Sequence, residues 1–158
     1  MSFKQSLAMI EWFFRRTEFI VWRIDLADET AQRLIDEGLN RYNVENAALH
    51  EVEPLCLKAV DDRGVLQAGL KGRTWGQCAE VEQLWVDARY RRQGLGSRLM
   101  LAFEQSATKR SCTSIYLSTL SFQAPGFYLK LGFEELARVE AHGSHLDIVK
   151  FWMIKRLR

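Results

Sequence analysis

The sequence predicts one α/β domain with a mixed, mostly antiparallel central sheet of about seven strands flanked by helices. Three observations carry this prediction. A length of 158 residues suits a single hydrophobic core. Several segments have the alternation or the short apolar run of a strand, and three others repeat apolar residues at helical spacing. Turn-forming residues separate these segments, which favours short connections and a mixed sheet with helices on its faces.

The first elements follow from local patterns. Glu18–Asp25 alternates enough to predict a strand, while residues 1–18 are aromatic-rich and predict either an N-terminal extension or a docking segment. Asp28 is a suitable N-cap for a helix that ends near Asn40. Its apolar residues recur at helical spacing: Ala31, Leu34, Ile35 and Leu39. The polar stretch 41–53 then predicts a loop.

Three antiparallel strands come next. Leu55–Val60 and Val65–Leu70 surround an Asp-Asp-Arg-Gly turn, which is a hairpin signal, and Cys78–Val86 continues the sheet. From Gly94 to Lys109 the period changes to that of an amphipathic helix. The remaining elements are a strand, a short helix ended by Gly132, and two strands: Ser114–Leu120, Ala124–Leu131, Phe133–Val139 and Asp147–Leu157.

The composition narrows the function. Hydrophobic residues make up 47% and charged residues 27%, which argues against a disordered chain. The formal charge of +2 and the sequence pI of about 8.5 lie below the strongly basic range, roughly above 9, of a dedicated nucleic-acid-binding domain. No apolar stretch approaches the roughly 20 residues of a membrane span. We therefore expect neither nucleic acid nor membrane as a partner.

The cysteines indicate the compartment. Cys56, Cys78 and Cys112 are odd in number and far apart, which predicts a reducing, cytoplasmic location. Cys56 and Cys112 lie in or beside apolar strand patterns, where a buried, inert thiol is usual. The pair His142 and His145 lacks the spacing and partners of a metal site, so we expect no metal.

Residues 84–99, LWVDARYRRQGLGSRL, join a strand to a helix through a basic turn. Amides in the first turn of a helix have no internal partners and lie at the positive end of its dipole, so they bind phosphate where no side chain intervenes. Gly94 and Gly96 leave that approach open. Charged and hydroxyl groups surround the same turn: Arg89, Arg91, Arg92 and Ser97. The segment predicts an anion site.

Familiar nucleotide motifs do not fit this segment. A dinucleotide fingerprint needs a third glycine where Leu99 stands, and a P-loop needs Gly-Lys-Ser/Thr. Instead, Arg91-x-x-Gly94-x-Gly96 resembles the acyl-CoA pyrophosphate motif of the GNAT superfamily of N-acetyltransferases. A second block, SFQAPGFYLKLGF over residues 121–133, resembles the downstream segment of that family. The resemblance covers roughly residues 78–133 and implies transfer of an acetyl group from acetyl-CoA to a primary amine, by direct attack in a ternary complex.

The resemblance also implies a cofactor site. The diphosphate would lie on the turn and the start of the helix, at Arg91, Arg92, Gln93, Gly94, Leu95, Gly96 and Ser97. The pantetheine arm would follow the preceding strand at Leu84, Trp85 and Val86. Ser121 stands where many relatives have a cofactor-contacting Asn, so Gln123 is an alternative for that contact.

Acetyl transfer needs a base and an acid. An alkyl ammonium with a pKa near 10.4 must lose a proton before it attacks. Glu80 matches the register of a catalytic glutamate in some GNAT enzymes, and Glu82 is the second candidate. Strand alternation places both on the face of Leu84 and Val86, although a solvated, exposed pair is the alternative. Tyr128 matches the family position that commonly protonates the leaving thiolate; packing alone is the alternative.

The acceptor stays open. Loop 41–53 and the turn 140–147 carry acids that would suit a small-molecule amine or a protein amine. The alternative function is a non-catalytic acyl-CoA-binding or regulatory module on the same fold. A homodimer is a further expectation, because Phe151–Ile154 ends the chain in an apolar strand that needs cover.

Overall fold

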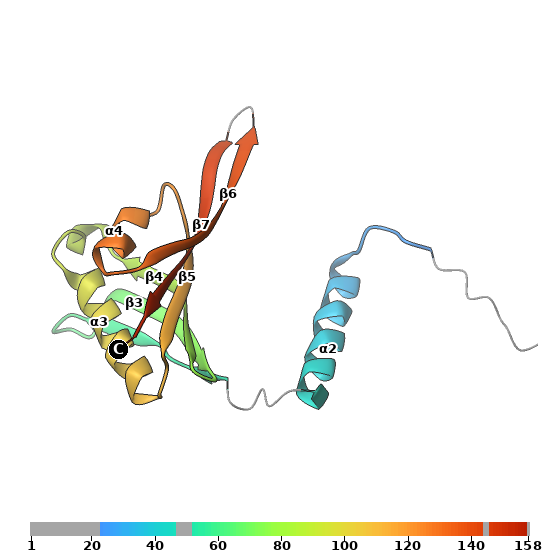
Figure 1. The fold of residues 1–158 in the computed structure, drawn as a ribbon, viewed down its shortest axis with the longest axis horizontal. Helices are drawn as coiled ribbons and strands as arrows, with labels where there is room; N and C mark the ends of the chain where they lie inside the picture. The colour runs from blue at the N-terminus through green and yellow to red at the C-terminus, as the bar shows by residue number, and fades with distance from the viewer. Residues whose placement is uncertain (1–22, 47–51, 144–145, 158) are drawn as a thin grey trace, which may run out of the picture. The chain divides into compact units, whose positions relative to one another are not determined.

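The computed structural model describes residues 23–46, 52–143 and 146–157. The chain divides after Tyr42 into two compact units. Most of helix α2 (Glu29–Asn46) belongs to the first and the whole sheet belongs to the second (Figure 1). The single-domain assignment therefore remains a prediction. The N-terminal extension and most of the strand predicted over residues 18–25 lie outside the described residues, and Arg23–Asp25 forms no regular element.

Helix α2 starts as predicted and ends later. The Asp28 carboxylate accepts a hydrogen bond from the Ala31 amide at 2.7 Å, which is the expected N-cap. The helix then runs through Gly38 to Asn46, so the predicted end near Asn40 and the loop over residues 41–46 are wrong. A single interior glycine costs only about 1 kcal/mol relative to alanine, which is too little to end a helix.

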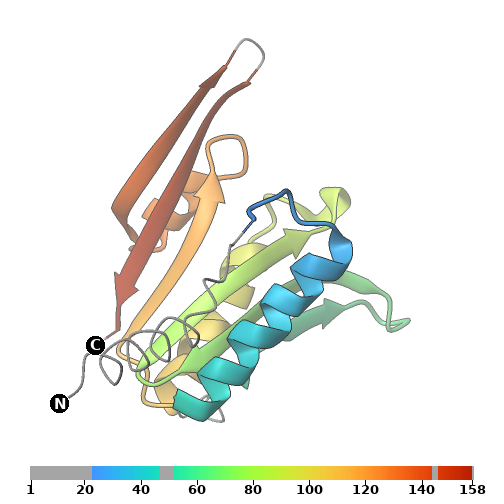
Figure 2. The ribbon, with the colours of Figure 1, turned by 90° about the vertical axis from the view of Figure 1, so that its right-hand side faces the viewer.

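The sheet has seven strands and confirms the predicted fold class. Their order is β1-β3-β4-β5-β7-β6, with β2 also paired to β3, and only β4 and β5 are parallel among the described strands. The bounds are β1 Glu53–Pro54, β2 Leu57–Val60, β3 Leu66–Trp75, β4 Cys78–Val86, β5 Ser114–Leu120, β6 Glu134–Gly143 and β7 Leu146–Arg156. The turn predicted over residues 140–147 is mostly strand, because the β6–β7 hairpin projects beyond the other strands (Figures 1 and 2).

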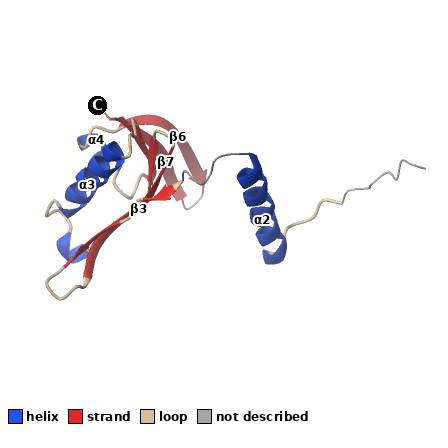
Figure 3. Cartoon of the chain, turned by 90° about the horizontal axis from the view of Figure 1, so that it is seen from below, coloured by secondary structure: helices blue, strands red, loops and turns tan. Residues whose placement is uncertain are grey.

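Two helices cover one face of the sheet. These are α3 (Leu95–Lys109) and α4 (Pro125–Lys130), which lie on the same side in Figure 3. Phe103 of α3 is fully buried against the sheet. Its ring lies so close to Gly72 of β3 that a Cβ there would be 2.9 Å from it and 2.3 Å from the Glu80 carbonyl oxygen. Glycine at this position therefore sets how closely α3 packs on the sheet.

Two of the cysteines differ in environment. Cys112 is buried, as predicted, and burial raises the pKa of its thiol. Cys56 is exposed, contrary to the prediction, because it lies between the edge strands β1 and β2. Within the described part of the chain, no helix is long and apolar enough to cross a membrane.

Candidate acetyl-transfer site

A cleft of about 860 Å³ opens between β4 and β5. The two strands pair only from Cys78 to Val81 and from Ser114 to Leu117. They then run on separately toward Val86 and Leu120, and Figure 2 shows them diverging. The cleft has the volume of a small-molecule or cofactor site. The divergence also leaves main-chain groups of β4 after Val81 without partners in β5.

Most predicted cofactor residues line this cleft. They are Leu84, Val86, Arg91, Arg92, Gly94, Leu95, Gly96, Ser97 and Tyr128. Trp85, Gln93 and Ser121 are not among the lining residues. The Gln93 side-chain amide donates to the Arg89 carbonyl at 2.9 Å, and Ser121 is tied to Val149 of β7 by two hydrogen bonds. Trp85 projects from the opposite face of β4 to its neighbours.

The start of α3 presents free amides to the cleft. Gly94 caps the helix with a φ of 79°, a left-handed conformation that favours glycine. The first helical hydrogen bond runs from the Arg98 amide to the Gly94 carbonyl at 3.0 Å, so the amides of residues 95–97 have no helical acceptors. A Cβ at Gly96 would stay 3.5 Å from the Phe127 ring, an ordinary contact. Packing within the protein therefore tolerates a side chain at Gly96. Glycine is needed here only if a ligand must approach the amides closely.

The arginines of the turn have separate tasks. Arg89 pairs with Asp87 at 2.9 Å, and this hydrogen bond holds the pKa of the Asp87 carboxyl below its usual value. Arg91 donates to the Val86 carbonyl at 3.0 Å and fixes the turn to the end of β4. Arg92 lines the cleft and has no ion-pair partner among the described residues. It is the arginine best placed to meet an anion.

A β-bulge in β4 controls which side chains face the cleft. Lys71 pairs with Gln83, but Gly72 pairs with Val81, so Glu82 is an extra residue in β4. Leu84 packs on the core and Val86 lies near Gly96 of α3, so both face the helices. The prediction that Glu80 and Glu82 share their face is therefore wrong, because strict alternation ignores the bulge.

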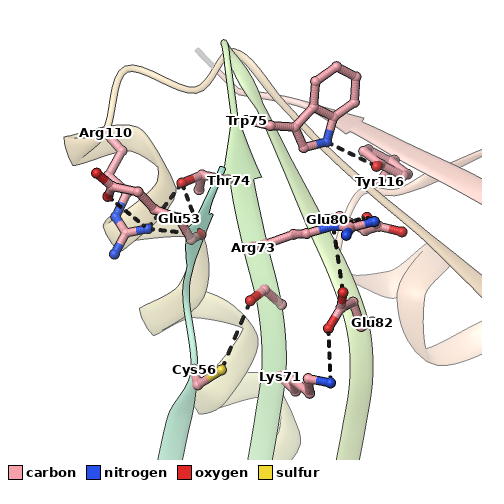
Figure 4. Close-up of polar contacts among 11 residues, drawn as sticks. Glu53, Cys56, Lys71, Arg73, Thr74, Trp75, Glu80, Glu82, Arg110 and Tyr116 are labelled. Atoms are coloured by element: carbon pink, nitrogen blue, oxygen red, sulfur yellow. Dashed lines mark hydrogen bonds and ion pairs between the residues drawn. The ribbon is translucent and has the colours of Figure 1, made fainter. Parts of the chain in front are cut away.

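The two glutamates lie on the face away from α3, in a polar network with Lys71 and Arg73 (Figure 4). Arg73 Nε and Nη2 both lie 2.7 Å from one oxygen of Glu80. Glu82 is held more loosely, at 3.5 Å from Arg73 Nε and 3.5 Å from Lys71 Nζ. Only Glu82 lines the cleft. The two carboxylates therefore have different surroundings, a difference that the sequence alone does not show.

Aromatic residues extend this network. The Trp75 indole donates to the Tyr116 hydroxyl at 3.1 Å (Figure 4). Burial raises the pKa of the Tyr116 phenol, and its hydrogen bond with Glu80 acts in the same direction. Glu80 is therefore engaged from two sides, by Arg73 and by Tyr116. Sequence reasoning missed Tyr116, because the match between β4 and β5 registers is not visible in a local pattern.

Tyr128 of α4 reaches the cleft from the other wall. Its ring packs edge-on against Phe127 and Phe133, with centroids 5.1 and 5.8 Å away. Burial raises the pKa of its phenol. The hydroxyl has no hydrogen-bond partner among the described residues, so it is available to a ligand. Gln123 also lines the cleft, and its side chain accepts a hydrogen bond from the Leu120 amide at 2.9 Å, which holds the end of β5.

Other candidate chemistry is not visible in the site. Within residues 23–46, 52–143 and 146–157, no group of three or more His, Cys, Asp or Glu side chains could hold a metal ion.

Lys150 of β7 also lines the cleft, and sequence reasoning missed it. Its strand carries no motif, and its approach to the cleft depends on pairing with β5, which only the fold reveals.

Comparisons with known proteins agree with this geometry. The chain is 42% identical over 89 residues to blasticidin-S acetyltransferase of Streptomyces morookaense, which covers 56% of this chain and 65% of that protein, a little under two thirds. A crystal structure of an acetyltransferase from Bacillus cereus superposes with a TM-score of 0.72 at 28% identity, covering 86% of this chain and 98% of that one.

The fold also matches a Bacillus anthracis str. Ames protein solved in complex with acetyl coenzyme A. The TM-score is 0.59 at 22% identity, over 66% of this chain and 63% of that one. Finally, residues 7–133 match the acetyltransferase (GNAT) family. That match spans most of the sequence and agrees with the seven-stranded fold, so the chain belongs to the GNAT family of acetyltransferases.

Proposed function

We propose that this protein is an acetyl-CoA-dependent N-acetyltransferase that acts on a small-molecule amine by direct attack in a ternary complex. The observation that carries the proposal is the cleft between β4 and β5, which ends at the free amides of α3. A thioester carrier with a diphosphate needs both features: a slot for an extended arm and a terminus for the anion.

The cofactor residues divide by chemistry. The amides of residues 95–97 and the Arg92 side chain would hold the diphosphate. Unpaired main-chain groups after Val81 would receive the pantetheine amides, since β5 has already turned away there. When bound, acetyl-CoA supplies the acetyl group as a thioester. Side chains of this chain then move the protons.

Glu82 is the preferred base. It lines the cleft and sits between Lys71 and Arg73, whereas Glu80 lies outside the lining and is bound at 2.7 Å by Arg73. A carboxylate at the wall of the cleft can accept a proton from an ammonium. The amine nitrogen then attacks the acetyl carbonyl carbon, the new C–N bond forms, and the C–S bond breaks.

Tyr128 is the preferred acid. Burial raises its pKa, so the phenol is protonated at neutral pH and can give its proton to the leaving thiolate. Its hydroxyl lines the cleft without a hydrogen bond to another described residue. The nitrogen loses two protons on its way from ammonium to amide, one to Glu82 before the attack and a second to solvent as the tetrahedral adduct collapses. The thiolate gains one proton from Tyr128, which solvent replaces, so each cycle releases one proton.

The acceptor is best sought among amine antibiotics. The 42% identical relative is named for blasticidin S, and the matched segment covers 65% of that relative. Blasticidin S is therefore the first acceptor to try, followed by other small amines.

Two measurements test the proposed function. Calorimetry of acetyl-CoA with the purified chain should show binding, and a thiol-release assay should show turnover with at least one small amine. Absence of acetyl-CoA binding would refute the proposal. Tight binding without turnover on any amine would instead support the non-catalytic acyl-CoA module.

A further inference from the structure

The cleft carries opposite charges on opposite sides. Among its described lining residues, Glu82 is the only acid and Lys150 is the only lysine. Glu82 comes from β4 and Lys150 from β7, so the diverging end of β5 lies between their strands. Such a pair can orient a ligand that has two charged ends, because each end has its own counter-charge.

Lys150 is built into this position rather than free on the surface. It pairs with Leu120 at the end of β5 and with Val139 of β6. Its ammonium lies 5.1 Å from the centre of the Trp152 ring, a cation–π contact that holds the side chain along the sheet. No carboxylate pairs with it among the described residues. Its positive charge is therefore available to a ligand anion.

Lys150 also lies on the acceptor side of the sheet. Its neighbour Phe151 packs into the core beneath α3 and α4, so Lys150 points to the other face. Glu82 shares that other face, through its ion pairs with Lys71 and Arg73. The arginines and free amides proposed for the diphosphate lie instead at the N-terminus of α3. Lys150 is thus placed to meet the acceptor, whereas the start of α3 is placed to meet the diphosphate of acetyl-CoA.

We propose that the acceptor is an amino-acid-like zwitterion, whose amine lies beside Glu82 and whose carboxylate or other anionic group binds Lys150. This inference rests on the proposed function. A compound with positive charge at both ends would bring its second cation against Lys150 and lose affinity. The cleft therefore selects amines by a second, anionic group and not by positive charge alone.

Matched acceptors test this selection. The probes are a series of unbranched ω-amino acids of increasing length, the primary carboxamides of the same acids, and diamines of the same lengths. We expect kcat/KM for the best amino acid to exceed that of its carboxamide and its diamine by about tenfold or more, as for a charge-assisted hydrogen bond. Equal rates across the three series would overturn the inference.

Variants locate the effect. Lys150→Met keeps the apolar stem beside Trp152 but removes the charge, and should abolish the preference for amino acids while the KM for acetyl-CoA stays unchanged. Lys150→Arg should preserve the preference. Lys58→Met, an exposed lysine of β2 outside the cleft, is the matched control and should behave like the parent protein.

The remaining outcomes are distinct. A rise in the KM for acetyl-CoA in Lys150→Met, with the amino-acid preference intact, would assign Lys150 to the cofactor and overturn the inference. So would acetyl-CoA binding with turnover of amines but of no zwitterion. Failure to bind acetyl-CoA at all would refute the proposed function itself, and calorimetry before the acceptor assays separates that case from the others.

Discussion

Single residues in this site acquire their roles from neighbours in space. Glu80 and Glu82 are chemically identical and two positions apart, yet Arg73 binds Glu80 at 2.7 Å while Glu82 alone borders the cleft. Likewise, Tyr128 owes its raised pKa to burial. The sequence motif that contains Tyr128 is contiguous, and the structure places this residue in the lining of the cleft. The motifs ranked Glu80 before Glu82 as the base, whereas we propose the opposite order because only Glu82 of the two lines the cleft.

Exchange of each glutamate separates their roles. Glu82→Gln should lower kcat by about a hundredfold or more, because the general base is lost. Glu80→Gln keeps the shape of the network and should lower kcat by less than about tenfold. Steady-state thiol release with one amine gives both values. A larger loss in Glu80→Gln than in Glu82→Gln would return the base to Glu80.

Removal of the phenol tests the acid. Tyr128→Phe should lower kcat by about a hundredfold with little change in the Kd for acetyl-CoA. Because burial raises the phenol pKa, the acid form persists above the ordinary value of 10.0, and activity that depends on it should fall only at more alkaline pH. The pH profile of kcat checks this. An alkaline limb below pH 10 that survives in Tyr128→Phe would assign that limb to another group.

At the scale of elements, local signals located the central segments well. The bounds of β4 and β5 agree with the prediction, and α3 begins one residue after Gly94, since strand patterns and a glycine cap are written in adjacent residues. The bulge at Glu82 was not predictable, because it is a mismatch with β3 and has no signature within β4. The predicted end of α2 was wrong for a related reason, because a single glycine is a weak signal for the end of a helix.

The two motif glycines should respond differently to alanine. Gly94→Ala forces a left-handed φ of 79° on a residue with a Cβ and should cost about 1 kcal/mol of the free energy of unfolding, measured by urea denaturation. Gly96→Ala should unfold with nearly unchanged stability, because the new methyl group meets Phe127 at an ordinary 3.5 Å.

Although Gly96→Ala should leave the stability nearly unchanged, it should weaken the binding of acetyl-CoA. If the amides of residues 95–97 receive a diphosphate, the methyl group of Gly96→Ala should weaken acetyl-CoA binding by about tenfold in calorimetry. Unchanged affinity in this variant, with the fold intact, would move the diphosphate away from the start of α3.

For the whole molecule, one packed layer joins the helices to the strands that form the cleft. Phe103 is completely buried and contacts the strand that carries Arg73, while Lys155 of β7 binds Glu104 of α3 at 2.6 Å. The sequence predicted the fold class because these apolar patterns recur along the chain. It could not place Lys150 in the cleft, since that depends on how β5, β6 and β7 pair.

The core makes a stability prediction at this scale. Phe103→Ala should lower the free energy of unfolding by about 3 to 5 kcal/mol, the usual cost of an emptied aromatic site. Leu101→Ala, on the exposed side of the same helix, is the control and should change it by less than about 1 kcal/mol. Urea denaturation followed by circular dichroism measures both. Similar losses in the two variants would show that Phe103 does not anchor the helix.

If Glu82 is the base, as proposed, the one extra residue in β4 makes the length of this strand, and not only its chemistry, a determinant of activity. Loss of Glu82 would remove the bulge and restore simple alternation, while Gln83 and the residues after it keep their partners in β3 and their present faces. On the proposed roles, loss of this one codon would remove the base and leave every other proposed site residue in place. A homologue without the extra residue would then need a proton acceptor from another part of its fold.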